Sequence, residues 1–160
     1  MSTVSEQQFT ELYNRQVNVA YRVCYAYMKS PSPTEDAVQE TFLRLLTKAP
    51  VFDSESHEVA WVVRTATNVC KDMLKSWWRR KITLDDTEGR TEEHHIDTTL
   101  LAVLSLPDKY KSVVYLFYYE GYQAAEIAEG LGLPASTVRN YLSEARKLLR
   151  TQLGGEFDEE

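Results

Sequence analysis

The residues with the clearest chemical potential form a polar row between positions 64 and 79. The row has four cations and one amide at spacings of four, three, four and four: Arg64, Asn68, Lys71, Lys75 and Arg79. Side chains three or four residues apart share one side of an α-helix, so the row would form a single polar face. Cations hold phosphates, and an amide can read the hydrogen-bonding edge of a base. The row is therefore a candidate nucleic-acid site; the alternative is a helical face that simply meets solvent.

A helix from about residue 58 to residue 80 must position that row. Its opposite side carries an apolar stripe at helical spacing, made of Val62, Ala66, Val69 and Met73 and extended by Val63, Cys70, Leu74 and Trp77. Three consecutive cations, Arg79, Arg80 and Lys81, end the helix. Residues 61–81 hold six basic side chains and one acidic side chain, although the whole chain has a formal net charge of −6. The positive charge is thus concentrated where phosphates would bind.

Residues 122–150 have the pattern of a helix-turn-helix, which is a second candidate site. Gly132 can take a positive φ, so a first helix can end there in a sharp turn, and Pro134 fits the first turn of a second helix. The first helix has an apolar side of Ala124, Ile127, Ala128 and Leu131, and the second has one of Val138, Leu142, Ala145 and Leu149. Five residues of the second helix would face outward: Ser136, Thr137, Arg139, Asn140 and Ser143. The second helix is predicted to enter a DNA major groove; two helices that merely pack together are the alternative.

Two further helices are predicted before residue 58, at residues 5–29 and at about residues 34–48. The segment Ser30-Pro31-Ser32-Pro33 separates them, because each proline disfavours helical geometry in the residue before it. Thr34 is the expected N-cap of the second of these helices. The outer side of that helix carries four polar residues and one leucine within about two turns: Glu35, Asp36, Gln39, Glu40 and Leu43. Such a surface could bind a basic partner.

The remaining segments predict an all-α fold of two small helical domains joined by a flexible acidic linker. Residues 82–97 have six acidic side chains and one basic side chain without apolar periodicity, which is typical of a linker. Helical patterns return around residues 100–106 and 107–121. The predicted organisation is a first domain at 1–81, the linker at 82–97, a helix-turn-helix domain at 98–153 and an acidic tail at 154–160.

Several classes of protein are not indicated by the sequence. No apolar run is long enough to span a bilayer, and the polar residues 2–8 are unlike a signal peptide, so a cytoplasmic protein is expected. No nucleophile elbow, phosphate-binding glycine loop or zinc signature is present, so we expect no enzyme, cofactor or metal. Cys24 and Cys70 lie among apolar neighbours and are interpreted as small buried residues. His94 and His95 are expected to be free in solvent.

Three blocks, in this order, resemble the extracytoplasmic-function class of bacterial RNA polymerase sigma factors across residues 9–153. Residues 35–42 (Glu-Asp-Ala-Val-Gln-Glu-Thr-Phe) are similar to the family's acidic D-x-x-Q-E-x-F helix, which grips the polymerase clamp coiled coil. Residues 61–68, followed by Asp72, resemble the segment that melts and reads the minus-ten promoter element. Residues 106–150 resemble the second domain of the family. The resemblance implies a sigma factor that directs promoter recognition, DNA melting and transcription initiation.

The same resemblance implies a role for each candidate site. Contact with core polymerase, at its clamp coiled coil and flap, would involve Glu35, Asp36, Gln39, Glu40 and Leu43. The minus-ten element would meet Arg64, Asn68, Lys71, Lys75, Arg79 and Arg80, with Asn68 lining the pocket of a flipped base. The minus-thirty-five element would meet Ser136, Thr137, Arg139, Asn140 and Ser143. The linker would thread through polymerase channels, and an anti-sigma factor is implied as a further partner.

The chain differs from the family pattern at three positions in and before the predicted recognition helix, and two other functions remain open. The family often has arginine where this chain has Tyr141 and Glu144, and Pro134 replaces the usual hydroxyl residue that opens the recognition helix. These differences affect the expected upstream sequence preference. A polymerase-independent helix-turn-helix regulator is one alternative, although the acidic helix disfavours it. A redox or metal sensor built on Cys24, Cys70 and the histidines is the other, and the spacing of these residues does not support it.

Overall fold

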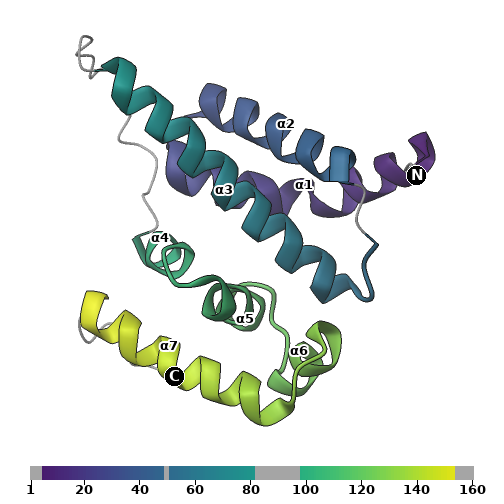
Figure 1. Ribbon diagram of the computed structural model, residues 1–160, viewed down its shortest axis with the longest axis vertical. Helices are drawn as coiled ribbons and strands as arrows, with labels where there is room; N and C mark the ends of the chain where they lie inside the picture. Colours follow the sequence, from purple (N-terminus) through teal and green to yellow (C-terminus); the bar gives the residue numbers. More distant parts are fainter. Residues whose placement is uncertain (1–4, 49–50, 82–97, 154–160) are drawn as a thin grey trace. The chain divides into compact units, whose positions relative to one another are not determined.

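The computed structural model describes residues 5–48, 51–81 and 98–153, and of residues 77–81 and 98 only the backbone (Figure 1). Every regular element in these ranges is a helix, so the predicted all-α class is confirmed. The predicted acidic linker at 82–97 and the acidic tail at 154–160 lie outside the described residues. Each helix in the described ranges is too short or too polar to cross a bilayer.

The contacts between residues divide the chain into two compact units. Among the described residues, the first unit contains 5–48, 51 and 62–81, and the second contains 52–61 and 98–153. The helices α1 (Glu6–Met28), α2 (Pro31–Lys48) and most of α3 (Glu55–Lys81) belong to the first unit. The second unit contains α4 (Thr98–Leu104), α5 (Asp108–Tyr118), α6 (Ala124–Leu131) and α7 (Ala135–Leu153). The domain boundaries inferred from the sequence remain a prediction.

The turn between α1 and α2 is shorter than the sequence predicts. Lys29 ends α1 in the left-handed conformation, with φ 63°, and α2 begins at Pro31. Both Pro31 and Pro33 therefore lie in the first turn of α2, where a helix has no internal partner for its N–H groups. Thr34 is inside the helix, and its hydroxyl donates to the Ser30 carbonyl at 2.7 Å. The prediction that Thr34 is the N-cap is thus wrong, because proline at a helix start is favourable.

The core of the first unit comes from the apolar stripes that the sequence predicts. In α3 the side chains of Val62, Val63, Ala66, Val69 and Cys70 are completely buried. Cys24 of α1 is buried with them, which confirms the expectation that both cysteines are internal. Contact with the Cys24 thiol and burial raise the pKa of Cys70, so its thiol stays neutral.

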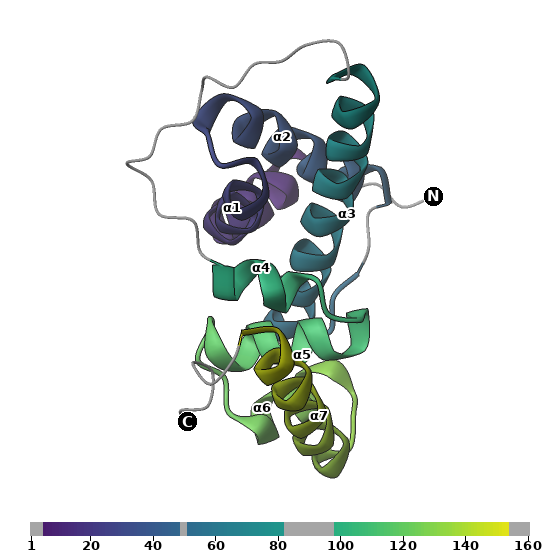
Figure 2. The same cartoon turned by 90° about the vertical axis from the view of Figure 1, so that its left-hand side faces the viewer.

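The helix-turn-helix of the second unit forms as predicted, except that Pro134 directly precedes α7 instead of lying in its first turn (Figure 2). Gly132 ends α6 in the left-handed conformation, with φ 70°. The Pro134 carbonyl then accepts hydrogen bonds from the N–H groups of Thr137 and Val138, and α7 begins directly after this proline. The predicted apolar side of α7 is buried, and it consists of Val138, Leu142, Ala145 and Leu149. In α6 only the central pair, Ile127 and Ala128, is fully buried.

Candidate functional site

The polar row of α3 lies on the exposed side of that helix. Arg64, Asn68, Lys71 and Lys75 are all exposed, while Val62, Val63, Ala66, Val69 and Cys70 on the opposite side of α3 are buried. Met73 and Leu74, which the sequence predicts for the same apolar stripe, are only half-buried. Because the buried side fixes the rotation of the helix in the core, it also fixes which side chains meet solvent. Arg79 and Arg80 belong to the last turns of α3, and their side chains lie outside the described part of the chain.

An open hollow lies beside the amide of Asn68. Six side chains line it, from α2 and α3: Arg44, Asn68, Lys71, Asp72, Leu74 and Lys75. Three of these side chains are cations and one is an anion, so the lining has a formal charge of +2. Leu74 gives the hollow an apolar part, and Asn68 gives it a neutral donor and acceptor. This combination suits a flat, uncharged ring that is attached to a phosphate.

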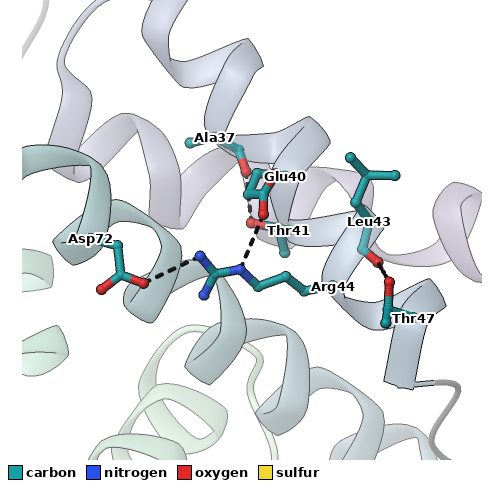
Figure 3. Close-up of polar contacts among 7 residues, drawn as sticks. All are labelled: Ala37, Glu40, Thr41, Leu43, Arg44, Thr47 and Asp72. Carbon is teal, nitrogen blue, oxygen red and sulfur yellow. Dashed lines mark hydrogen bonds and ion pairs between the residues drawn. The ribbon is translucent and has the colours of Figure 1, made fainter. Parts of the chain in front are cut away.

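Arg44 is a member of this hollow that the sequence reasoning missed. Its Nε lies 3.3 Å from Glu40 Oε2 on α2, and its Nη2 lies 3.2 Å from Asp72 Oδ2 on α3 (Figure 3). The side chains of Arg44, Glu40 and Asp72 are 35%, 44% and 58% exposed, so both ion pairs are partly hydrated. The spacing of four from Glu40 to Arg44 is visible in the sequence. The contact with Asp72 is not, because it joins two helices across 28 positions.

The outer face of α2 presents both acids and an apolar side chain. Glu35, Asp36 and Gln39 are exposed, Glu40 is half-buried, and Leu43 is 56% exposed. The hydroxyl of the buried Thr41 donates to the Ala37 carbonyl at 2.8 Å, so this buried hydroxyl has a partner within its own helix (Figure 3). This face of α2 therefore offers a partner both acidic groups and one exposed apolar side chain.

Four of the five residues predicted to face outward from α7 are exposed. Ser136, Arg139, Asn140 and Ser143 are exposed, and Thr137 is half-buried. Of the two departures from the family pattern on this helix, Glu144 pairs with Lys147, with Oε2 and Nζ 3.6 Å apart. Tyr141 is half-buried, and its ring meets the ring of Tyr110 from α5 edge to face, with the centroids 5.4 Å apart.

Comparison with protein families identifies the class to which both units belong. Residues 12–80 match the family model described as Sigma-70 region 2, and residues 97–149 match the model described as Sigma-70, region 4. The chain is therefore a sigma-70 protein that contains these two regions. More particularly, it belongs to the extracytoplasmic-function sigma factors, as the relatives below show.

The relatives match over most of their own length. The chain is 30% identical to the RNA polymerase sigma factor SigV of Bacillus subtilis (strain 168), over 83% of each protein. It is 27% identical to the ECF RNA polymerase sigma factor SigW of the same organism, over 92% of this chain and 90% of SigW. Among solved structures, CnrH in complex with the cytosolic domain of CnrY has a TM-score of 0.51 at 20% identity. That match covers 95% of this chain and 91% of CnrH, and it supports the fold alone.

Family membership establishes the general function. The protein directs RNA polymerase in promoter recognition and transcription initiation, binds DNA through the helix-turn-helix of region 4 and is not an enzyme. RNA polymerase binding is implied by the family. The alternative of a polymerase-independent regulator is therefore set aside. For the metal-sensor alternative, the described residues contain no group of three or more His, Cys, Asp or Glu side chains placed to hold an ion, and His94 and His95 lie outside these residues.

Proposed function

We propose that α3 opens the minus-ten promoter element and that the hollow beside Asn68 receives one base flipped out of the opened strand. The composition of the hollow is the main support for this proposal, because one amide, one leucine and three cations line a space that a single nucleotide could occupy. Extruding a base costs a few kcal/mol, which contacts with the extruded base and its phosphates must offset.

Each group of the hollow has a distinct part in this proposal. The Asn68 amide would donate to and accept from the edge of the base, and Leu74 would pack against its ring. Lys71 and Lys75 would hold the phosphates on either side, and Arg64 would extend the phosphate contacts one turn further along α3. Arg79 and Arg80 would continue them toward the end of the helix. Only the amide discriminates between bases.

The outer face of α2 is the proposed contact with core polymerase. Glu35, Asp36, Gln39 and Glu40 would meet a basic partner at the clamp coiled coil, and Leu43 would be buried in that interface. A leucine that is 56% exposed in the free protein can lose most of its hydrated surface on binding. The acidic side chains around it would favour a basic partner and fix its orientation.

The second unit is proposed to recognise the minus-thirty-five element with α7 in the major groove. Ser136, Arg139, Asn140 and Ser143 would approach base edges or phosphates, and Thr137 would support them from the half-buried side. We further propose that polymerase contributes its flap as a second contact and that the protein acts in the cytoplasm, where promoter DNA is transcribed.

An anti-sigma factor is proposed as a further partner. CnrH, which is similar in fold, has been solved in complex with the cytosolic domain of CnrY. The exposed Leu43 on α2 would be available to such a partner whenever polymerase is not bound. We also propose the functional division already inferred from the sequence, with residues 1–81 and 98–153 acting at separate promoter elements and 82–97 joining them.

The experiment that tests the hollow compares Asn68→Ala with Lys75→Ala in reconstituted holoenzyme. Transcription would be measured on a library of promoters with every single-base change in the minus-ten element. Asn68→Ala is expected to change the base preference at one position, because the amide reads a base edge. Lys75→Ala is expected to weaken all promoters alike, because a phosphate contact is blind to sequence. An even loss for both variants would show that Asn68 is not a reader.

A further inference from the structure

The two sides of the exposed face of α7 differ in charge. One side has arginines at spacings of seven and four, which are Arg139, Arg146 and Arg150. The other side has residues at spacings of four, three and four, which are Thr137, Tyr141, Glu144 and Leu148. All of α7 is described, and these four positions on its second side include no cation. Phosphates of a DNA duplex run along both walls of a groove, so a helix in that groove meets phosphates on both of its sides.

A lysine from another helix lies on the side that lacks arginine. The Nζ atom of Lys109, in the first turn of α5, is 5.7 Å from the centre of the Tyr141 ring and 5.0 Å from the centre of the Tyr110 ring. The two rings pack edge to face at an interplanar angle of 75°. A cation over an aromatic face is attracted to it, so the rings restrict where this ammonium group can lie. Lys109 is itself exposed.

The acidic residues of these two helices, Asp108 and Glu144, are both in ion pairs with other lysines. Asp108, which precedes the lysine, has its Oδ1 3.2 Å from Nζ of the buried Lys111. Glu144, one turn beyond Tyr141, pairs with Lys147. These two carboxylates are thereby partly neutralised, and the charge of Lys109 stays available to an anion from solution. Tyrosine hydroxyls are also common donors to phosphate, so the surroundings of the lysine suit a phosphodiester.

We propose that Lys109 binds a phosphate of promoter DNA on the side of α7 opposite the arginines. The contact supplies a positive charge from α5 to a side of the recognition helix where the ammonium group of Lys147 is paired with Glu144. It rests on the proposed placement of α7 in the major groove of the minus-thirty-five element. As a phosphate contact, it adds affinity and orientation without reading the sequence.

The test uses the full chain assembled with core polymerase and duplex promoter DNA, with affinity measured across a series of salt concentrations. Lys109→Gln removes the charge from an exposed side chain, and Lys109→Arg retains it. Lys29→Gln is the matched control, because Lys29 is an exposed lysine of the first unit. Asn140→Ala, measured on promoters with single-base changes in the upstream element, tests the groove assignment separately.

Lys109→Gln should make the negative slope of log affinity against log salt shallower by about 0.9, which corresponds to the loss of one phosphate contact. The affinity should fall by the same factor for every upstream sequence, and Lys109→Arg should restore the slope. A slope equal to that of Lys29→Gln would overturn the role of Lys109 while leaving α7 in the groove. An unchanged base preference in Asn140→Ala would instead overturn the groove assignment, and the proposed phosphate contact with it.

Discussion

Single and double substitutions of Arg44 and Asp72 can separate two effects on DNA binding: the charge of the hollow and the ion pair between these two residues. The lining has a formal charge of +2, which becomes +1 in Arg44→Gln and +3 in Asp72→Asn. The double variant, Arg44→Gln with Asp72→Asn, has a charge of +2 again but lacks the contact between α2 and α3. If the hollow attracts phosphates mainly by its charge, the double variant should bind promoter DNA like the unchanged protein.

The expected magnitudes follow from the exposure of these groups. A unit charge about 7 Å from a phosphate in a water-like dielectric contributes about 0.6 kcal/mol, or about threefold in affinity. At physiological ionic strength the Debye length of about 8 Å makes this effect smaller. Each ion pair of Arg44 is partly exposed and contributes only about 0.2–1 kcal/mol to the free energy of unfolding. Arg44→Gln loses both pairs, about 0.4–2 kcal/mol together, and should therefore still fold, with a melting temperature lower by about 1–8 °C.

The assay is fluorescence anisotropy of holoenzyme on promoter DNA that is already single-stranded at the minus-ten element, at low and at physiological salt. Arg44→Gln is expected to bind about threefold more weakly at low salt and Asp72→Asn more tightly by a similar factor. The double variant should return to the starting affinity while keeping its lower melting temperature. A double variant that binds as weakly as Arg44→Gln would refute the charge argument and show that the ion pair positions the hollow.

Two further predictions concern α2 and the turn before α7. Leu43→Ser should leave the fold intact, because the side chain is 56% exposed, but it should weaken core polymerase binding about tenfold, as expected for a central interface residue. The matched control is Leu148→Ser, at a leucine of α7 that is 43% exposed. Equal affinities of the two variants in a core-binding titration would contradict the assignment. Gly132→Ala should lower the free energy of unfolding by about 1 kcal/mol, because φ is 70° at this position. Gly132→Asn should lower it by less, since asparagine tolerates this conformation better than alanine. Equal melting temperatures for the glycine, asparagine and alanine proteins would refute this reasoning.

The sequence predicts what depends on neighbours within one helix. The spacing of Val62, Ala66 and Val69 indicates the buried side of α3, and the same logic places Asn68 on its exposed side. Gly132 is predictable because few other residues adopt a positive φ. Burial and φ are local enough for a pattern of three or four residues to determine them.

Contacts between helices are what the sequence does not reveal. Arg44 meets Asp72, and Lys109 meets Tyr141, only because two helices pack at a certain distance and angle. Periodicity identifies the face of each helix but not which residue lies opposite it. The early start of α2 is hard to predict for a different reason. A proline can break a helix or begin one, and Pro31 begins α2.

The burial of both cysteines makes this chain convenient for site-specific chemical labelling. Cys24 and Cys70 are the only thiols of the sequence, both are inaccessible, and Cys70 has a raised pKa, so maleimide reagents should react with neither in the folded protein. One cysteine introduced at an exposed position, such as Ser143→Cys on α7, would then be the single attachment point for a fluorophore. A dye at that position could report the arrival of promoter DNA in real time, without removal of either native cysteine from the core.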